Sequence, residues 1–375
     1  MSTDPRADLH DAALEAGFDA AAWVGAGVAA RDTRVFEAWC DAGLQAGMDY
    51  LPRSASRRRD LTTTFAPALS ALVLMVSHNH AAPPKPSGGT RVGQVARYAW
   101  SRDYHALLRP VLDSLESVAA RLGVRARGYV DHAPILERGF AVRSGLGWRG
   151  RQSQVISTSL GALSSIAVLL TDAVPPSVER EHPDRCGRCT ACVSSCPTDA
   201  ILPDRTVDSR RCIAYYTVEH RGSVPIELRS QFGLHLFGCD DCLEICPWTT
   251  HAGRFSKLLE PDPELAFPDL EPWFTDSGHA FLRRYGDSAF ARARRRGMAR
   301  NAALVLGNLR DASHLHLLQS GASDAGWEVR EAVAWALGRF AHSVPSDALE
   351  RLRCDPDERV ALTARFALEG AFFAS

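Results

Sequence analysis

Cysteine is concentrated in one short part of this 375-residue chain, and its spacing constrains the fold more than any other feature. Eight of the ten cysteines lie between positions 186 and 246. The first four follow the pattern C-x-x-C-x-x-C-x-x-x-C-P and are Cys186, Cys189, Cys192 and Cys196. In bacterial ferredoxins with this pattern, the fourth cysteine ligates the other of two clusters. The run therefore predicts a protein with two 4Fe–4S clusters.

A second run, C-x-x-C-x-x-x-C-P, repeats the ending of the first run but is one cysteine short. Because each cluster takes four thiolates, the isolated Cys212 completes the two sets. Paired zinc sites are the alternative, but they would leave the two Cys-Pro endings unexplained. The ligand exchange assigns Cys186, Cys189, Cys192 and Cys246 to one cluster (cluster one), and Cys239, Cys242, Cys196 and Cys212 to the other (cluster two).

Charge and hydropathy exclude several classes of protein. The formal net charge is −1, so a nucleic-acid partner would need a local patch of positive charge. No apolar run approaches the roughly 20 residues of a membrane helix. The N-terminal sequence is acidic and lacks the layout of a signal peptide, so we expect a cytoplasmic protein without membrane association. A reducing cytosol disfavours disulfides, and the isolated Cys40 and Cys354 are expected to be small buried side chains.

The N-terminal half alternates between helical and strand-like stretches, which indicates an α/β or α+β domain. A segment dense in Pro and Gly at 82–89 predicts a loop. The expected helices are 9–16, 35–51 and 104–122, and the expected strands are 71–76, 125–130, 154–156 and 165–170.

The C-terminal part is rich in Ala, Leu and Arg and contains a weak repeat. Leu306, Leu337 and Leu368 recur at intervals of 31 residues, and Val329 and Val360 keep the same interval. This period predicts stacked helix pairs of the HEAT type, which usually form binding surfaces.

Five arginines gather just before and within the first repeat. They allow two interpretations, a solvated helix face or a patch that contacts the phosphates of a nucleic acid. The five are Arg292, Arg294, Arg295, Arg296 and Arg300.

Asp131 ends a predicted strand and precedes a helix that Pro134 is expected to open. Ligands of α/β sheets bind at such strand ends, so Asp131 is a candidate catalytic acid. The same position would also suit a helix N-cap. Two adjacent clusters relay electrons but do not transform a substrate. The chain is too long for a simple electron carrier, so we expect an enzyme with a further redox centre.

Six motifs in order resemble the epoxyqueuosine reductase family, and the resemblance covers nearly the whole chain. The isolated Cys212 with Y-x-T-V-E after it, then G-C-D-D-C, is similar to this family and to its reductive dehalogenase relatives. The motifs are ARYAWSRDYH at 96–105, VDHAPILERGFAVRSGLGWRG at 130–150, CGRCTACVSSCPTDAI at 186–201, RCIAYYTVEHRGSVPIELR at 211–229, FGCDDCLEICPW at 237–248 and RRRGMARNAALVLGN at 294–308.

The resemblance implies three domains: an α/β (α+β) cobalamin-binding catalytic domain at 1–175, a ferredoxin-like domain with two 4Fe–4S clusters at 176–255, and a HEAT-like helical domain that binds tRNA at 256–375. It implies a monomeric oxidoreductase that reduces epoxyqueuosine to queuosine at the wobble position of tRNA with a GUN anticodon, the last step of queuosine biosynthesis. Electrons from an unidentified donor would pass through the clusters to a base-off cobalamin and reduce its cobalt to Co(I).

The resemblance also implies roles for single residues. Asp131 matches the proton donor of the family. The expected cobalamin contacts are Arg57, Tyr98, Asp131, Gln152, Ser153 and Asp240. The chain departs from the family pattern near this expected site, with Arg151 and Gln152 where Lys-Asn is usual and Ala214 where serine is common.

Two other functions remain open at this point. A reductive dehalogenase-like enzyme acting on a small molecule would usually carry an export signal and would not need the helical repeats. A non-catalytic electron-transfer scaffold would have no use for a corrinoid.

Overall fold

The computed structural model describes residues 4–253, 256–340 and 347–372. They form two compact units that alternate along the chain. Unit 1 draws on Met1–Ala81, Ser101–Arg210 and Asp240–Glu260, and unit 2 on Ala82–Trp100, Arg211–Cys239 and Pro261–Ser375. These units differ from the expected division at 175 and 255, because the segments 82–100 and 211–239 belong with the C-terminal helices.

Unit 1 is built on a four-stranded sheet in which every neighbouring pair is antiparallel. An antiparallel sheet with helices on its faces is the α+β form of the expected fold class. Its strand order is β1 (Ala20–Gly25), β2 (Ser70–Ser77), β7 (Ser164–Thr171) and β4 (Ala126–Val130).

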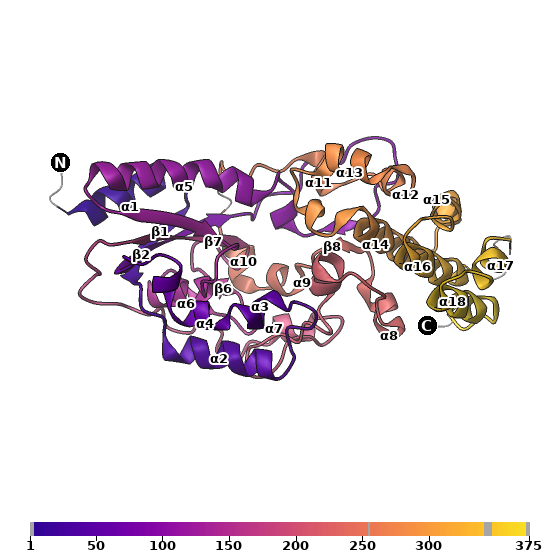
Figure 1. The fold of residues 1–375 in the computed structure, drawn as a ribbon, viewed down its shortest axis with the longest axis horizontal. Helices are drawn as coiled ribbons and strands as arrows, with labels where there is room; N and C mark the ends of the chain where they lie inside the picture. The colour runs from indigo at the N-terminus through magenta and orange to yellow at the C-terminus, as the bar shows by residue number, and fades with distance from the viewer. Residues whose placement is uncertain (1–3, 254–255, 341–346, 373–375) are drawn as a thin grey trace. The chain divides into compact units, whose positions relative to one another are not determined.

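Helices cover both faces of this sheet, so its central strands are apolar except at their ends. All eight residues of β2 are buried. The helices α1 (Pro5–Glu15) and α5 (Tyr104–Arg121) lie on one side in Figure 1, and α6 (Glu137–Arg143) lies on the other. On the α6 side Val73 and Met75 pack with Phe140 in one buried cluster.

The sequence predicted most of these elements. The expected strands at 71–76, 125–130 and 165–170 are β2, β4 and β7, and the expected helices at 9–16 and 104–122 are α1 and α5. The helix expected at 35–51 is wrong in its C-terminal half, because α2 (Ala30–Asp41) ends before Gly43, whose φ is 67°. The strand expected at 154–156 is β6 (Val155–Ile156), which pairs with β5 (Trp148–Arg149) outside the main sheet.

Short helices complete unit 1 around the cysteine runs. They are α3 (Tyr50–Arg53), α4 (Ala55–Arg59), α7 (Ala191–Ser194), α9 (Asp241–Glu244) and α10 (Pro247–His251). Cys40 is half-buried in α2, whereas Cys354, expected to be buried, is exposed because it follows the last residue of a surface helix in unit 2.

Unit 2 is mainly helical. It contains one parallel strand pair, β3 (Gln94–Val95) with β8 (His235–Phe237), and the loop predicted at 82–89 leads into it. Its α-helices are α8 (Ile226–Arg229), α11 (Pro263–Ala266), α12 (Glu271–Thr275), α13 (Gly278–Tyr285), α14 (Arg294–Leu309), α15 (Leu315–Gly321), α16 (Trp327–Gly338), α17 (Asp347–Arg353) and α18 (Glu358–Leu368).

The 31-residue period corresponds to the three longest of these helices, α14, α16 and α18, which pack side by side. Glycine allows the close approach at both contacts. A Cβ atom on Gly307 would lie 2.9 Å from the Cα of Ala336, and one on Gly338 would lie 3.0 Å from the Cα of Ala367. The recurring Leu-Gly pair therefore marks where successive helices touch.

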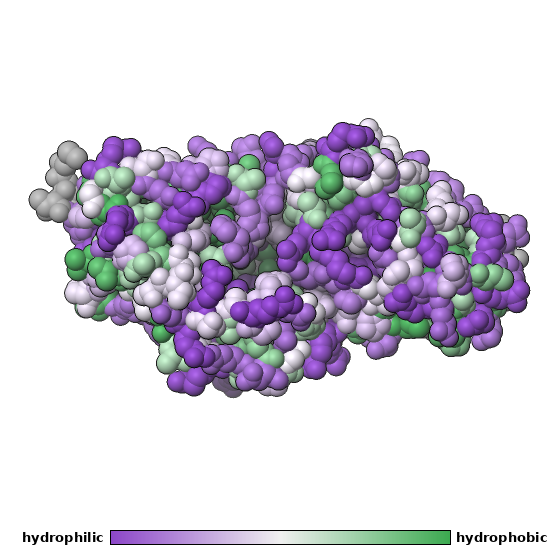
Figure 2. Space-filling model, in the orientation of Figure 1, coloured by the Kyte–Doolittle hydropathy of each residue, from purple (hydrophilic) through white to green (hydrophobic). Residues whose placement is uncertain are grey.

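Of the helices in the described ranges, none combines the length and the apolar character that a membrane crossing requires. On the face of the molecule in Figure 2, hydrophilic residues predominate and hydrophobic residues occur in small groups.

Candidate functional site

The four cysteines assigned to cluster one come from distant parts of the sequence and line one pocket in unit 1. Three belong to the first run, around α7, and Cys246 immediately precedes α10. The helix α7 packs against α9, which lies within the second cysteine run, so the two runs are neighbours in space. The fold thus brings together the set of thiols that the exchanged ligand pattern requires.

Hydrogen-bond donors already point at these sulfur atoms. The indole Nε1 of Trp148 donates to Cys186 Sγ at 3.3 Å. Pro247 occupies the first position of α10, and the amides of Trp248 and Thr249 donate to Cys246, that of Thr249 also to its carbonyl oxygen at 2.9 Å. Burial raises the pKa of the Cys246 thiol, so iron rather than the protein alone must favour its thiolate. The Cys-Pro ending therefore starts a helix whose first amides face a ligand.

The cluster-two cysteines are divided between the units. Cys196 and Cys242 belong to unit 1, and Cys212 and Cys239 belong to unit 2. Cys196 Sγ accepts a hydrogen bond from the amide of Ala200 at 3.2 Å. No disulfide occupies any of the ten thiols, all of which lie within the described ranges.

Asp131 lies in the turn between β4 and α6 with a left-handed backbone (φ 54°). Its Oδ2 accepts a hydrogen bond from the phenol of Tyr104, the first residue of α5. The alternative role as a helix N-cap is wrong, because α6 begins at Glu137 and Leu136 holds the N-cap position. The helix also starts three residues after Pro134. An exposed acid in a sparsely populated backbone region is typical of a functional position.

Glu137 lies close enough to Asp131 for the two carboxyls to repel each other electrostatically. Its side chain is half-buried, and its Oε1 is buried without a hydrogen-bond partner in the described part of the chain. Burial, followed by the charge of Asp131, raises the pKa of Glu137 to about 8, against the opposing effect of Arg58 and Arg138. Unit 1 therefore holds one exposed acid and, near it, a second carboxyl group whose burial favours the protonated form.

The expected cobalamin contacts Gln152 and Ser153 follow the strand β5. Gln152 is 3% exposed, and neither polar atom of its side chain has a partner among the described residues. Ser153 has a φ of 71°, and Arg138 donates to its carbonyl oxygen at 3.0 Å. Because a buried amide without partners is costly, this position suits a ligand with polar groups.

The other expected contacts are more scattered. Arg57 is an exposed residue of α4. Tyr98 belongs to unit 2, where its ring lies 6.1 Å from that of Phe237. Asp240 is buried and precedes α9, and its carbonyl oxygen accepts from Leu243 at 2.8 Å. Their roles toward a corrinoid stay predictions.

Three family profiles match the chain. The epoxyqueuosine reductase QueG profile (DUF1730) matches residues 58–132, the 4Fe–4S double cluster binding domain matches 185–249, and HEAT repeats match 289–369. The double-cluster match includes all eight clustered cysteines and supports two iron–sulfur clusters.

Curated relatives decide the family. Epoxyqueuosine reductase of Pseudomonas aeruginosa is 35% identical over 323 residues, 81% of this chain and 86% of that protein. The enzyme of Escherichia coli is 35% identical over 313 residues, 81% of each chain. This chain belongs to the epoxyqueuosine reductase family. It is therefore an oxidoreductase, which excludes the non-catalytic scaffold.

Solved epoxyqueuosine reductases share the whole fold. One, in complex with a tRNA-Tyr epoxyqueuosine-modified stem loop, matches with a TM-score of 0.88 and 26% identity over 99% of both chains. The Bacillus subtilis enzyme, with its catalytic aspartate loop swung out of the active site, matches with a TM-score of 0.87 and 26% identity, covering 97% of this chain and 98% of that one.

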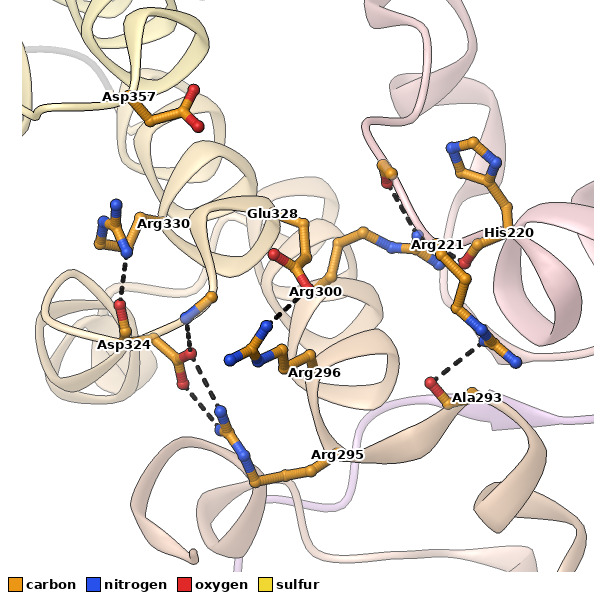
Figure 3. Close-up of polar contacts among 12 residues, drawn as sticks. His220, Arg221, Ala293, Arg295, Arg296, Arg300, Asp324, Glu328, Arg330 and Asp357 are labelled. Atoms are coloured by element: carbon orange, nitrogen blue, oxygen red, sulfur yellow. Dashed lines mark hydrogen bonds and ion pairs between the residues drawn. The ribbon is translucent and has the colours of Figure 1, made fainter. Parts of the chain in front are cut away.

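The five arginines of this segment do not form one surface, because two of them are used inside unit 2. Arg300 is 1% exposed and donates to the carbonyl oxygens of His220 and Gly222 at 3.0 and 2.9 Å (Figure 3). Arg295 forms a bidentate ion pair with Asp324 at 2.7 and 3.0 Å. These two cations hold unit 2 together, and burial lowers the pKa of Arg300 to about 10.

Three arginines of the segment are exposed. Arg292 is paired with Glu219 through two hydrogen bonds of 2.9 and 2.7 Å. Arg296 reaches Glu328 only at 3.9 Å, and its side chain is 55% exposed. Arg294 makes no ion pair with a described residue. The segment therefore leaves Arg294 and Arg296, rather than five arginines, for an external anion.

Three residues of the site were not predicted. Glu137 and Trp148 lie inside the motif at 130–150. A glutamate there also suits the start of a helix, and a tryptophan there also suits a core. Arg58, adjacent to the predicted Arg57, donates to the carbonyl oxygen of Ile135 at 2.9 Å and acts on Asp131 and Glu137 electrostatically. Consecutive arginines on a helix such as α4 point in different directions. Their positions on the helix were therefore the only signal that could have separated Arg58 from Arg57.

Proposed function

We propose that this chain reduces epoxyqueuosine to queuosine at the wobble position of tRNA with a GUN anticodon, as the last step of queuosine biosynthesis. In this proposal an unidentified donor supplies electrons, which pass through two 4Fe–4S clusters to cobalamin. The observation that carries it is the strained, exposed Asp131, held by Tyr104 in the same unit as the cluster-one cysteines. The tRNA stem loop held by a relative of the same fold supports the choice of substrate.

Asp131 acts as the proton donor. Opening an epoxide leaves an alkoxide, which is too basic to depart unless an acid protonates it. The turn after β4 exposes the carboxyl, and the phenol of Tyr104 limits its orientation. The left-handed backbone is the local cost of presenting the acid in this way.

The residues present fit the proposed cofactors. The cysteines named above for clusters one and two would hold the iron. Gln152, with its two unpartnered amide atoms, and Ser153 would bind the polar periphery of a corrinoid, with further contacts from Arg57, Tyr98, Asp131 and Asp240. When bound, these groups supply low-potential one-electron transfer and a reducing cobalt centre.

The remaining expectations belong to the same proposal. The exposed Arg294 and Arg296 in unit 2 would contact tRNA phosphates, and the wobble base would be splayed out for reaction. We also propose a monomeric, cytoplasmic enzyme with functional segments at 1–175, 176–255 and 256–375.

Conversion of the tRNA base tests this function. The protein is reconstituted anaerobically with iron, sulfide and cobalamin and incubated with reductant and tRNA that carries epoxyqueuosine. Nucleoside mass analysis should show the loss of one oxygen atom, only when cobalamin is present. Unchanged epoxyqueuosine after full cluster and corrinoid loading would refute the function and favour a small-molecule substrate.

A further inference from the structure

We infer that an acidic ferredoxin, a small protein that carries one electron on an iron–sulfur centre, docks on unit 1 over cluster one and delivers electrons there. The inference rests on the proposed function and names the kind of donor that its electron path requires. The docking surface is a basic rim around the cluster-one pocket, formed by Arg151, Arg185 and Arg188.

Cluster one is the cluster with a ligand at the protein surface. Of the eight clustered cysteines, all of which lie within the described ranges, Cys189 alone is exposed, and the others are half-buried or buried. Electron tunnelling weakens steeply with distance, so a donor must bring its redox centre close to the acceptor. An exposed sulfur ligand lets a partner protein approach cluster one without a change in the fold.

Two arginines flank this thiol without an acidic partner. Arg188 immediately precedes Cys189, Arg185 immediately precedes Cys186, and both arginines are exposed. Neither forms an ion pair with a residue that the structure describes. The guanidinium carbon of Arg185 lies 5.9 Å from the centroid of the Trp248 ring, which keeps this charge at the edge of the pocket. The two charges are therefore available to a partner.

A third arginine adds to this positive charge, and the acid of the same loop is neutralised. Arg151 lines the pocket, and its Nη2 donates to the uncharged carbonyl oxygen of Gly187 at 2.9 Å. Asp184 accepts a hydrogen bond from the amide of Cys186 at 2.8 Å and is paired with Arg205. A chain with a formal net charge of −1 thus presents a basic surface around an exposed cluster ligand.

Apolar side chains beside the rim supply the centre of an interface. Ile245 and Pro247 lie on either side of the ligand Cys246 in the sequence, and both are exposed, Ile245 to 49%. Pro247 and the half-buried Trp248 line the same pocket as Arg185. Protein interfaces combine an apolar centre with a polar rim and are enriched in aromatic residues and arginine. This surface therefore has the composition of a protein docking site.

A carrier protein fits these features better than the phosphates of tRNA do. Positive charge around a redox centre steers an acidic carrier so that the two centres meet, and such electron-transfer interfaces are small and weak. Phosphates gain nothing from a nearby cluster, and the cations proposed for tRNA, Arg294 and Arg296, belong to unit 2. Among acidic carriers, a ferredoxin holds a low-potential cluster of the same chemistry as its acceptor.

Each encounter moves one electron. The iron–sulfur centre of the reduced ferredoxin is oxidised by one electron, and cluster one is reduced by one. Two encounters therefore supply one turnover, in which both carbon–oxygen bonds of the epoxide break, the carbon–carbon double bond forms, and the oxygen takes up two protons and leaves as water.

The test measures docking and cluster reduction in the iron-loaded protein without tRNA, with reduced plant-type ferredoxin as the probe. The rim variant carries Arg185→Gln and Arg188→Gln. The matched control carries Arg121→Gln and Arg127→Gln, which remove the same charge from exposed positions of α5 and β4. Calorimetry gives the affinity, and stopped-flow absorbance gives the rate of reduction. At low salt we expect the rim variant to lose about tenfold in affinity and rate, and the control to match wild type.

Salt and a chemical reductant separate docking from a structural role of the arginines. At about 1 M salt, where the screening length falls to about 3 Å, the difference in rate between the rim variant and the control should disappear. Iron content and the rate of reduction by dithionite should be equal in all three proteins. Slower reduction of the rim variant by dithionite would show that the arginines shape the cluster itself, which would overturn the inference.

The remaining outcomes identify the occupant of the surface. Equal ferredoxin affinity in the rim variant and the control would overturn the inference. A rim variant that loses affinity for tRNA but not for ferredoxin would overturn it too, since the rim would then bind RNA. A rim-dependent response to an acidic flavodoxin alone would replace the ferredoxin by a flavin carrier and overturn the choice of partner. A wild type that takes electrons from ferredoxin yet converts no epoxyqueuosine would refute the proposed function and support the docking surface.

Discussion

The cysteine-rich segment of unit 1 and the arginine-rich segment of unit 2 each concentrate one chemically active residue type. The sequence predicts how the cysteines are used but not how the arginines are used. In unit 1, four predicted ligands of cluster one line one pocket. In unit 2, five neighbouring arginines have different partners: Arg300 and Arg295 are internal, Arg292 is paired, and Arg294 and Arg296 face solvent.

The difference comes from how much of each site is local. Cysteine spacing is set by the geometry of a short loop wrapped around a cluster, so the spacing itself carries the chemistry. An arginine on a helix can satisfy a distant carbonyl, pair with an acid or remain free, and its neighbours in sequence do not distinguish these outcomes.

Removal of one cluster ligand should abolish function. We expect Cys192→Ser to lose cluster one and with it about half of the bound iron, and to show no reduction of epoxyqueuosine, because the electron path is broken. Cys40→Ser is the control, since Cys40 is a half-buried residue of α2 outside the runs. Iron and sulfide analysis checks both. Full iron content in Cys192→Ser would remove Cys192 from the ligand set.

Replacing the buried Arg300 should destabilise the fold rather than affect the chemistry directly. We expect Arg300→Met to lower the free energy of unfolding by about 3–5 kcal/mol, because carbonyl oxygens at 220 and 222 lose a buried partner. The exposed Arg296→Met should change it by less than about 0.5 kcal/mol. Denaturant unfolding measures the two. Equal effects would contradict the assignment of internal and external arginines.

The exposed arginines should matter for tRNA instead. We expect the double variant Arg294→Gln and Arg296→Gln to bind tRNA more weakly and to reduce the slope of log affinity against log salt by about one per lost phosphate contact. Arg353→Gln, an exposed arginine paired with Glu350 in α17, is the control. Binding is titrated at several salt concentrations. An unchanged slope would exclude phosphate contacts by Arg294 and Arg296.

The smallest effect concerns the tuning of cluster one. Trp148→Phe removes the hydrogen bond to Cys186, and we expect the cluster potential to fall, since such bonds stabilise the reduced state. A bond worth about 1 kcal/mol corresponds to a shift on the order of 40 mV for one electron. Trp248→Phe, which lines the same pocket, should leave the potential unchanged. Redox titration measures the potentials of both variants. Equal potentials would exclude this role for Trp148.

The extent of successful prediction follows the same division between local and distant contacts. Apolar runs located β2 and β7, but burial on both faces hides strand direction, so the antiparallel sheet could not be deduced. The strand β1 was missed because its sequence, AAAWVG, opens with alanines, which have weak strand preference. The helix expected to reach residue 51 ended early because a glycine at 43 could adopt a left-handed conformation.

The candidate site was predictable where the family motif or spacing singled out a residue. The sequence placed Asp131 after a strand, which the structure confirms, whereas its left-handed backbone and its hydrogen bond with Tyr104 depend on packing, and its catalytic role stays a prediction. Glu137 could not be predicted in the same way. The burial of its Oε1 and the lack of a hydrogen-bond partner for that atom among the described residues are both tertiary properties.

The central claim is that the clusters supply electrons and Asp131 supplies a proton to the epoxide. Its most direct test measures iron content, bound corrinoid and product mass together for wild type and Asp131→Asn. We expect equal iron, corrinoid and tRNA binding, with loss of one oxygen atom in wild type only. Full conversion by Asp131→Asn would contradict the account.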